Sequence, residues 1–560
     1  MTMICVPILA DDPAVAKRDA ILAAEKGSDI VEFRVDLLME ADLSLDARIG
    51  QIKDLVAESP LPCIVTCRPE WEGGLYAGDE DERVSMFEAL GTADSPPAYI
   101  DVELKAYTAS ANIRQKINLA VDHPKQERHV RTRLILSSHD FSGRPADLTR
   151  TLLAMQAEPA CAVVKVAYRA RSIRDNLELF DILSERQKPT IALGMGEFGL
   201  MSRVLAPKFG GFLTFASLRD ESATAPGQPT IDDLLGMYRF RSIGKDTRVY
   251  GVIGWPVTQS MSPLIHNAGF AQIGWDGVYV PMPVEGSYES FKATLIALAG
   301  HRGLHFTGAS VTIPHKVNTV TFAEELAKTQ RLDLQRADPA NLAETIRAAN
   351  TLNQISVCGH GDEIEFELHN TDALAISDLV SEVIAPRSLK DIKVRIYGAG
   401  GAARAAAYPL VARGATIELV NRSFVAAHNL YSELVGSLVG QSVRGEIFLP
   451  DYGELPDGTC DIYINCTPVG MISGPDPTGQ SISVGSVPAV HSDPVFFDTV
   501  YNPIETPMLK AAKERGYRTI DGVQMFVRQA AAQFELWTGK PAPVELFDRL
   551  VRAKLGGKTG

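Results

Sequence analysis

The sequence predicts an α/β protein in two parts, a (β/α)8 barrel followed by a second α/β module. Short apolar runs alternate with amphipathic stretches up to Phe240, the pattern restarts at Val249, and a glycine-rich turn stands at Gly398–Ala403. Apolar runs without strict alternation are typical of strands buried on both faces, which form parallel sheets. Eight strand–helix units in about 240 residues are what a (β/α)8 barrel requires. The runs are Met3–Ile8, Ile30–Val35, Cys63–Thr66, Ala98–Val102, Leu134–Ser137, Ala162–Val166, Thr190–Leu193 and Phe212–Phe215.

The overall composition narrows the function classes. A chain of 560 residues exceeds one core, and its 45% hydrophobic and 22% charged residues are typical of globular protein. The net charge of -14 argues against nucleic acid, and an anionic substrate would need a local basic pocket. The seven cysteines have no metal-ligand spacing, so we expect reduced thiols and no metal. Met1–Ala10 lacks signal-peptide features and no run approaches the roughly 20 apolar residues of a membrane helix, so we expect a cytoplasmic protein.

A lysine inside a buried strand is the most informative single residue. Lys165 lies in the apolar run Val163–Ala167, where a charged amine is costly unless it is paired or deprotonated. It either extends to the rim of the barrel or acts as an uncharged amine that forms a Schiff base with a ketone. His139 ends the preceding run and is either structural or a general acid/base. Arg34, Arg68 and Arg203 follow other runs, and together they could hold a carboxylate.

Six segments, found in order over residues 1–238, resemble type I 3-dehydroquinate dehydratase. They are Val31–Arg34, Thr66–Arg68 with Glu72, Ser138–Phe141, Val164–Ala167, Gly194–Gly196 leading to Ser202-Arg203, and Ala225–Gln228.

This resemblance implies a dehydration through an imine. Lys165 would attack the C3 ketone of 3-dehydroquinate, and His139 would move protons until water leaves and 3-dehydroshikimate forms. The resemblance also implies that Glu72 assists the histidine and that Arg203 pairs with the carboxylate of the substrate. Glu32, Arg34 and Arg68 would hold substrate hydroxyls and order the site. Gln228 would lie in a loop that closes over the site. Thr224 stands where the family usually has serine and keeps a hydroxyl.

The second module begins with a predicted strand, Val249–Ile253, and a helix starting near Leu264. Ser260 and Ser262 precede that helix, where they could cap it or hold a carboxylate at its positive end. Lys316 and Asp372 would make a proton-transfer pair if the fold brings them into one cleft.

The glycine-rich turn predicts a dinucleotide site. A strand at Val394–Tyr397, the turn Gly398–Ala403, a helix at Arg404–Arg413 and a strand at Ala415–Val420 give the fingerprint its required context. The second strand ends in Asn421-Arg422-Ser423 rather than in an acidic residue. Unless Arg422 is a solvated surface residue, this favours the 2′-phosphate of NADP over NAD.

Residues 248–555 resemble shikimate dehydrogenase. The similarity rests on Ser260–Pro263, Ser310–Lys316, Asn350-Thr351, Asn370–Asp372, Gly398–Ala403, Asn421–Ser423, Asn465–Met471, Tyr501–Pro503 and Asp521-Gly522 with Met525 and Gln529. It implies that Lys316 and Asp372 act on the C3 oxygen. The implied substrate contacts are Ser260, Ser262, Thr312, Asn350, Tyr501 and Gln529. The implied NADP contacts are Gly398, Ala399, Gly400, Gly401, Ala402, Asn421, Arg422, Ser423, Thr467, Met471 and Gly522. Ala373 replaces a usual glycine, and residues 322–347 form a charged insertion.

The two resemblances predict a bifunctional shikimate-pathway enzyme, because the product of the barrel is the substrate of the second module. The alternatives are a catabolic quinate/shikimate dehydrogenase and a catalytically silent metabolite sensor. The expected partners are NADP and the small molecules 3-dehydroquinate, 3-dehydroshikimate and shikimate, with no nucleic acid or membrane, in a monomer or dimer. The expected boundaries are the barrel at 1–240, a linker at 241–248, a substrate domain at 249–385, a Rossmann domain at 386–515, and C-terminal helices at 516–560 that return to the substrate domain.

Overall fold

A computed structural model describes the chain in segments, and these fall into two compact units. The described residues are 1–122, 131–219, 227–257, 259–328, 354–358, 365–437, 445–450, 460–487 and 493–556. The first unit comprises Met1–Thr247 with Val280–Pro283, and the second comprises Arg248–Tyr279 with Val284–Gly560. Within the described ranges no helix is long and apolar enough to cross a membrane.

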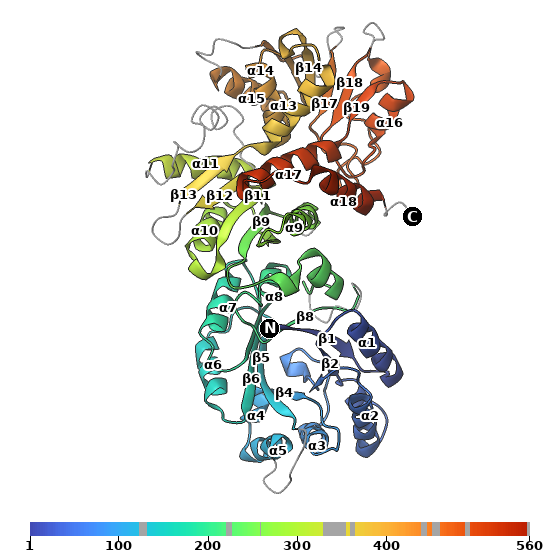
Figure 1. The fold of residues 1–560 in the computed structure, drawn as a ribbon, viewed down its shortest axis with the longest axis vertical. Helices are drawn as coiled ribbons and strands as arrows, with labels where there is room; N and C mark the ends of the chain where they lie inside the picture. Colours follow the sequence, from blue (N-terminus) through green and yellow to red (C-terminus); the bar gives the residue numbers. More distant parts are fainter. Residues whose placement is uncertain are drawn as a thin grey trace. The chain divides into compact units, whose positions relative to one another are not determined.

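The first unit contains the predicted parallel barrel (Figure 1). Its eight strands follow the order β7-β6-β5-β4-β3-β2-β1-β8, and the backbone N–H of Phe212 donates to Thr190 O over 2.8 Å where β8 meets β7. The strands are β1 (Met3–Leu9), β2 (Ile30–Arg34), β3 (Cys63–Thr66), β4 (Tyr99–Glu103), β5 (Arg133–Asp140), β6 (Cys161–Arg169), β7 (Thr190–Met195) and β8 (Leu213–Phe215). The predicted (β/α)8 fold is therefore confirmed.

Helices alternate with these strands around the barrel. They are α1 (Pro13–Glu25), α2 (Leu45–Ala57), α3 (Glu80–Gly91), α4 (Leu104–Tyr107), α5 (Ala111–Val121), α6 (Leu148–Ala157), α7 (Asp175–Ser184) and α8 (Leu200–Val204). Polar N-caps fix several starts; for example, Asp79 accepts hydrogen bonds from two backbone N–H groups of α3. The amphipathic pattern also predicts a last barrel helix over Ile231–Phe240, and the chain is helical there over 231–237, where two α-helical residues lead into the π-helix Asp233–Met237; the helix ends three residues early, and a 3-10 turn follows at Phe240–Ser242.

Residues that face the barrel interior recur at every second position of a strand. The apolar interior cluster contains Ile30 on β2, Tyr99 on β4, Ile135 on β5 and Val163 on β6. Two residues further along each strand stands a polar side chain, and in β6 this is Lys165. Because side chains alternate along a strand, these polar residues also face the barrel interior, next to the apolar interior cluster.

The second unit begins with a five-stranded sheet in the order β10-β9-β11-β12-β13. β9 (Arg248–Gly254) and β11 (Phe306–Val311) are parallel, and β12 (Gln354–Cys358) and β13 (Glu365–His369) continue antiparallel beside β11. β10 is Gly277–Pro283, and the helices of this part are α9 (Ser262–Gln272), α10 (Tyr288–Gly300) and α11 (Lys316–Lys328). Of the predicted insertion 322–347, only the part in α11 lies inside the described residues.

A six-stranded parallel sheet follows, in the order β16-β15-β14-β17-β18-β19. This is the dinucleotide-binding order 3-2-1-4-5-6, so the predicted Rossmann fold is confirmed. The strands are β14 (Lys393–Tyr397), β15 (Thr416–Val420), β16 (Ile447–Phe448), β17 (Ile462–Asn465), β18 (Val495–Asp498) and β19 (Arg518–Ile520). The helices are α13 (Thr371–Ile384), α14 (Gly401–Ala412), α15 (Phe424–Ser437) and α16 (Pro507–Glu514).

The last two helices share a core with the first sheet of this unit. α17 (Gly522–Thr538) and α18 (Val544–Gly556) contribute Val523, Phe534 and Val551 to a buried cluster with Tyr250 of β9 and Phe270 of α9. The chain thus leaves the Rossmann sheet after β19 and packs beside the strands with which the unit began.

Candidate functional site

One pocket in the barrel gathers the predicted site residues of the first half. Its lining includes Glu32, Arg34, Arg68, Glu72, His139, Lys165, Arg203 and Gln228 together with Phe141, Met195 and Phe215. The polar side chains come from β2, β5 and β6 and from the segments that follow strands β3, β7 and β8. This is the carboxyl-terminal side of the strands, where barrels of this kind place their active sites. Thr224 lies outside the described residues.

Lys165 is buried and faces two carboxylates. Its Nζ lies 2.7 Å from Asp101 Oδ2 and 3.5 Å from Glu32 Oε1, and the side chain is 6% exposed. The ring centroid of Phe215 lies 4.7 Å from the same nitrogen. The alternative in which the lysine extends to the rim is excluded by this burial. An amine enclosed in this way has the desolvated setting that a Schiff-base lysine requires.

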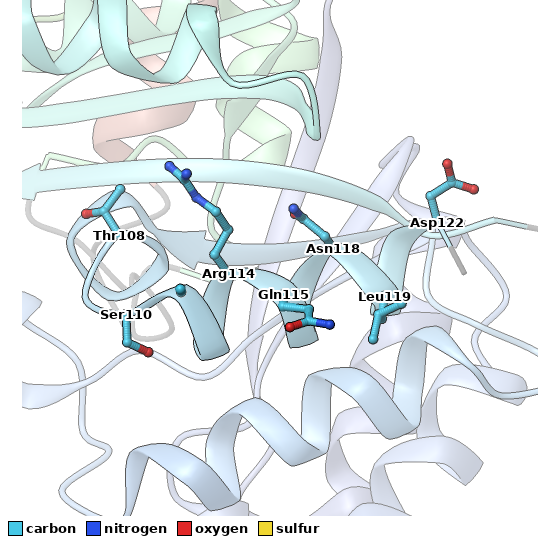
Figure 2. A pocket seen from close by; sticks show the side chains of 8 residues that line it. Thr108, Ser110, Arg114, Gln115, Asn118, Leu119 and Asp122 are labelled. Carbon is cyan, nitrogen blue, oxygen red and sulfur yellow. The ribbon is translucent and has the colours of Figure 1, made fainter. Parts of the chain in front are cut away.

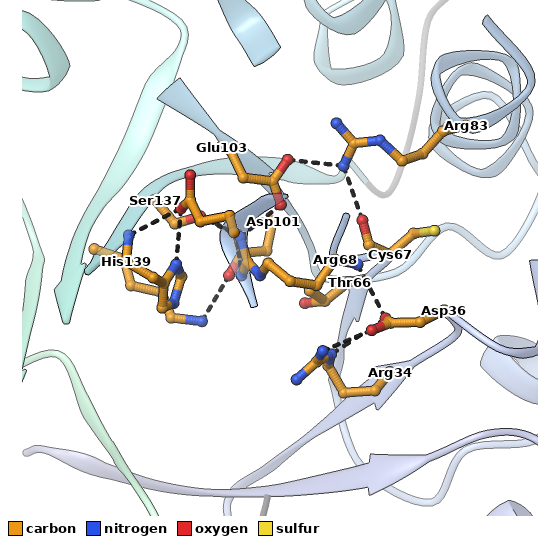
Figure 3. Close-up of polar contacts among 12 residues, drawn as sticks. Arg34, Asp36, Thr66, Cys67, Arg68, Arg83, Asp101, Glu103, Ser137 and His139 are labelled. Atoms are coloured by element: carbon orange, nitrogen blue, oxygen red, sulfur yellow. Dashed lines mark hydrogen bonds and ion pairs between the residues drawn. The ribbon is translucent and has the colours of Figure 1, made fainter. Parts of the chain in front are cut away.

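Arg68 holds the carboxylate that contacts the lysine (Figure 3). Its Nη2 lies 3.1 Å from Asp101 Oδ1, and its Nη1 donates to Glu103 Oε1 at 2.6 Å and to Ser137 Oγ at 2.8 Å. Ser137 in turn donates to Asp101 Oδ1 at 2.6 Å. Burial alone would raise the pKa of Asp101, but Arg68 and Lys165 hold it well below its usual range. Asp101 is therefore a fixed buried anion beside the amine.

His139 is paired with Glu72. Glu72 Oε1 accepts a hydrogen bond from the backbone N–H of His139 at 2.9 Å and lies 3.0 Å from its Nδ1. Burial, together with the positive charges of Arg68 and Lys165, holds the pKa of His139 well below its usual range. Burial also raises the pKa of Glu72 to about 8. The imidazole is thus neutral at neutral pH and able to accept a proton from a bound ligand.

Arg203 has the features of a site for an anion. The residue is 3% exposed, and its Nε has no hydrogen-bond partner within the described part of the chain. Burial lowers its pKa to about 10, which leaves it charged at neutral pH. A buried, charged guanidinium with an unused donor in a pocket calls for an anionic ligand. Arg34, by contrast, is already bound to Asp36, with its Nη2 at 2.6 Å from Oδ2.

Sequence reasoning missed Asp101 and Glu103. Both are fully buried on β4, and both belong to the ion pairs of Arg68. The signal was present: β4 reads Tyr99-Ile100-Asp101-Val102-Glu103, with charged residues at every second position after an interior tyrosine. Treating this run only as an apolar strand concealed the acidic stripe on its inner face.

A second hollow, on the outside of the barrel, does not have the arrangement of a catalytic site. It runs along α5 and is lined by Thr108, Ser110, Ala111, Arg114, Gln115, Asn118, Leu119 and Asp122 (Figure 2). Asn118 accepts a hydrogen bond from the Tyr107 hydroxyl at 2.8 Å, and Arg114 lies over the same ring. These side chains support the helix and converge on no common point, so we assign the chemistry to the interior pocket.

In the second unit, Lys316 and Asp372 are brought together. Lys316 begins α11 and Asp372 lies in the first turn of α13, and Lys316 Nζ forms an ion pair with Asp372 Oδ2. The side chains are 23% and 9% exposed, so the pair is reachable from outside. The predicted proton-transfer pair therefore exists as a contact.

Neutral hydrogen bonds organise the surroundings of this pair. Gln533 Nε2 donates to Gln529 Oε1 at 2.7 Å and to Thr371 Oγ1 at 3.0 Å, next to Asp372. Gln533 Oε1 accepts from Ser310 Oγ, whose hydroxyl also accepts from Tyr279 at 2.7 Å. Gln533 was not foreseen; its sign in the sequence is a glutamine one helical turn after Gln529 in an otherwise apolar stretch.

The other predicted substrate contacts are placed as follows. Ser260 Oγ accepts from the backbone N–H of Ser262, the first residue of α9, at 3.2 Å, whereas the N-cap position of this helix is Met261 and no side chain caps it. Thr312 follows β11, and Tyr501 stacks on Phe526 with ring centroids 5.1 Å apart. Asn350 lies outside the described residues.

The glycine turn has the shape of a dinucleotide site. Gly398 adopts φ +117°, and a Cβ there would lie 2.9 Å from Cys466 O, so only glycine fits. At Gly400, which precedes α14, a Cβ would meet nothing within 4 Å, and no side chain caps the helix. Gly401 and Ala402 begin that helix, and Ala399 lies in the turn. Open space at an uncapped helix start is where a pyrophosphate binds.

Residues expected around the rest of NADP surround the same sheet edge. Asn421, Arg422 and Ser423 follow β15, and Arg422 is exposed with no carboxylate of the described residues paired to it. Thr467 donates to Asn465 Oδ1 at 2.7 Å in the loop after β17, which continues to Met471. Gly522 opens α17, where a Cβ would lie 2.3 Å from Val500 O. Among the described residues, no group of acidic, histidine or cysteine side chains could hold a metal.

Fold and sites together define a lysine-dependent barrel enzyme joined to a dinucleotide-dependent oxidoreductase. Family models agree: type I 3-dehydroquinase matches residues 4–245, the shikimate dehydrogenase substrate binding domain matches 252–332, and the shikimate 5'-dehydrogenase C-terminal domain matches 522–552. The bifunctional 3-dehydroquinate dehydratase/shikimate dehydrogenase, chloroplastic, of Arabidopsis thaliana is 36% identical over 98% of this chain and 83% of its own length. The chain belongs to this bifunctional family.

Two further similarities cover one or both modules. Shikimate dehydrogenase (NADP(+)) of Methanocella arvoryzae is 37% identical over 55% of this chain and 99% of its own length. The solved structure of dehydroquinate dehydratase and shikimate dehydrogenase from S. pombe AroM is 24% identical, covers 98% of each chain, and gives a TM-score of 0.40.

Proposed function

We propose that the chain converts 3-dehydroquinate to 3-dehydroshikimate in the barrel and reduces 3-dehydroshikimate to shikimate in the second unit. The observation that carries the first step is the enclosed amine of Lys165 in one pocket with the guanidinium of Arg203, whose Nε has no partner among the described residues. The substrate needs both, because it bears a ketone for the amine and a carboxylate for the cation.

In the barrel, Lys165 Nζ attacks the C3 ketone and water leaves as the imine forms. The protonated imine withdraws electrons from the adjacent carbon, and His139, which is neutral at neutral pH, accepts the proton from that carbon. The hydroxyl group then departs as water after His139 returns the proton to it, and hydrolysis of the imine frees Lys165 and the product. Glu72 orients the imidazole through its two contacts with His139.

In the second unit, Lys316 and Asp372 act at the C3 oxygen. The ammonium group lies where it can donate a proton to an oxygen that becomes negatively charged, and Asp372 fixes its position through the ion pair. Gln529, whose Oε1 accepts from Gln533 and whose Nε2 donates to Phe526 O, would hydrogen-bond the substrate through its second amide hydrogen. When bound, NADPH supplies the hydride that reduces the carbonyl carbon.

The residues present fit NADP. The uncapped start of α14 would hold the pyrophosphate, and Asn421 and Arg422 would hold the 2′-phosphate, since no acidic residue there would accept from a free ribose hydroxyl. Thr467, Met471 and Gly522 would border the rest of the cofactor. This preference for NADP disfavours the catabolic, NAD-linked reading. The enclosed Lys165 and paired Lys316 disfavour a silent sensor, which has no use for either catalytic group.

Several finer statements belong to this proposal. We propose the domain boundaries given from the sequence, action in the cytoplasm, and a monomer or dimer. The name of the Arabidopsis thaliana relative carries the word chloroplastic, so fractionation of the source cells is the measurement for the compartment. Sedimentation of the purified chain checks its oligomeric state.

A coupled assay tests the function. Purified chain is mixed with 3-dehydroquinate and NADPH, NADPH oxidation is followed, and the product is identified as shikimate by chromatography. Borohydride is added to a parallel sample without NADPH to reduce and trap the imine, whose attachment to Lys165 is read by peptide mass. NADPH oxidation from 3-dehydroshikimate but not from 3-dehydroquinate would contradict the proposal for the barrel, and silence with both substrates would contradict the whole.

A further inference from the structure

Beyond the pocket, one charged residue is enclosed that the proposed reaction does not use. Arg83 lies on α3, outside the ring of strands, and its side chain is 0% exposed. Its Nη1 donates to Glu103 Oε2 at 2.7 Å and to the backbone oxygen of Cys67 at 2.8 Å. On its other side, Nε and Nη2 form two hydrogen bonds with Glu80, at 2.9 and 2.7 Å. Figure 3 shows the guanidinium reaching from its helix toward Glu103.

From Arg83 a chain of alternating charges leads to the reactive amine. Arg83 binds one oxygen of Glu103, and Arg68 binds the other at 2.6 Å. Arg68 also binds Asp101 Oδ1 at 3.1 Å, and Asp101 Oδ2 lies 2.7 Å from Lys165 Nζ. Every link is buried, so water does not screen it. The order is Arg83, Glu103, Arg68, Asp101, Lys165.

The charge of this chain depends on its outermost member. The two guanidinium groups and two carboxylates of this chain balance one another, while Glu80 beside Arg83 and Glu32 beside Lys165 add a carboxylate at each end. Without Arg83 the buried set loses one positive charge, which favours the protonated form of Lys165 over the uncharged amine. A buried carboxylate left without its partner is also strongly unfavourable, so Arg68 would turn further toward Glu103 and away from Asp101.

We propose that Arg83 is a positioning residue for the dehydration, acting through Glu103 and Arg68 to hold Asp101 in place and to keep the Lys165 amine available as a nucleophile. The inference rests on the proposed imine chemistry. Arg83 touches no pocket atom, and its influence passes entirely through the ion pairs described. The titratable and charged groups around the amine are Cys5, Glu32, Arg34, Arg68, Glu72, Asp101, Glu103, His139 and Arg203.

The test is a set of variants in the full-length chain, namely R83M, R83K, E80Q, E103Q and R83M/E103Q. For each, kcat and KM for 3-dehydroquinate are measured across pH, and borohydride trapping on Lys165 is measured across the same range. For R83M we expect kcat to fall by about tenfold or more with KM within about twofold, since small misplacements at a reacting centre have effects of this size. Half-maximal trapping should move up by about one pH unit, as expected when a buried positive charge near an amine is removed.

The companion variants separate positioning from packing. R83K keeps the charge and should keep the wild-type pH dependence. E80Q removes the partner on the other side of Arg83, so it should change kcat by less than about twofold. R83M/E103Q removes one cation and one anion, and its trapping profile should return toward that of wild type. Reduction of 3-dehydroshikimate by the same samples confirms that equal amounts of folded second unit are present.

The results distinguish a positioning role of Arg83 from a role in packing alone. A wild-type kcat and pH profile in R83M overturns the inference, as does a loss of kcat with no shift in the trapping profile, because that is a packing defect. If R83M does not fold, E103Q and R83M/E103Q are compared, and a further loss of more than about twofold on removing Arg83 overturns the route through Glu103. Absence of any adduct in the wild-type chain instead contradicts the proposed function itself.

Discussion

The two candidate sites differ in the interactions that hold their side chains in place: buried ion pairs in the barrel, and mostly neutral hydrogen bonds in the second unit. In the barrel, Arg68, Asp101, Glu103 and Lys165 are all buried and held by ion pairs of 2.6–3.1 Å. In the second unit, one ion pair, Lys316 with Asp372, is partly exposed, and the surrounding Gln529, Gln533 and Ser310 are neutral. A covalent imine needs an amine with a controlled charge, whereas hydride transfer from a bound cofactor needs only a placed proton donor. The difference in chemistry accounts for the difference in electrostatics.

The largest expected effect comes from removing the Lys165 amine in the barrel. K165M should lower dehydration at least about a thousandfold, because the described lining of the pocket holds no second lysine to form the imine. Reduction of 3-dehydroshikimate by the same protein should stay within about twofold, which is measured with NADPH in the same sample. Residual dehydration near the wild-type rate would show that the barrel works by another mechanism.

The corresponding change in the second unit is K316M. Loss of a positioned proton donor should lower the rate of reduction by about a hundredfold to ten-thousandfold. Dehydration should continue, so 3-dehydroshikimate should accumulate from 3-dehydroquinate and be visible by chromatography. D372N serves as the companion variant, with a smaller loss because the lysine remains. If both variants reduced the ketone normally, another residue would have to be the donor.

A substitution at the cofactor site tests a residue of the second unit that takes no part in the proton transfer. R422S should raise KM for NADPH by about tenfold, since an exposed arginine–phosphate contact is worth about 1.4 kcal/mol. KM for NADH, which lacks the 2′-phosphate, should not change and is the internal control. An equal effect on both cofactors would place Arg422 away from the 2′-phosphate.

The smallest expected effect is on stability, and only in the barrel. Folding raises the pKa of Glu72 to about 8, above its ordinary value near 4.5, so the folded barrel binds a proton more tightly than the unfolded chain does. The associated stability is present below about pH 4.5 and is lost as pH rises through about 8. E72Q should therefore show a flatter decrease in Tm between pH 5.5 and about 8.5 than wild type, by a few degrees.

The exposed neighbour Glu70 provides the matched control for that measurement. E70Q should show the wild-type dependence of Tm on pH, because the side chain lies on the surface. Identical curves for E72Q and wild type would mean that Glu72 is not enclosed as the structure places it.

The sequence predicted most of the fold because its signals were local. Eight apolar runs carried their own periodicity, and each lies in the expected strand. The glycine turn is followed by the expected helix, which begins at Gly401 rather than Arg404, and the last barrel helix ends at Met237 and is a π-helix over its last five residues.

The sequence predicted the residues that stand in motifs but missed those that join the sites through distant contacts. Lys165, His139 and Lys316 stand out as charged or titratable residues within motifs, and the structure gives each a partner. Asp101, Glu103 and Arg83 join the site through contacts with residues 16 to 64 positions away. The local pattern marks Asp101 and Glu103 as inward-facing acidic residues and Gln533 as a polar residue beside Gln529, but it does not report which distant residues they contact.

The alternation of side chains along the barrel strands has a consequence for how this chain can change. Five neighbouring strands, β2 to β6, direct their reactive side chains inward at every second position. Inserting or deleting one residue within any of them would turn the following side chains outward. Substitutions can therefore accumulate along these strands, whereas changes in length are confined to the loops and helices between them.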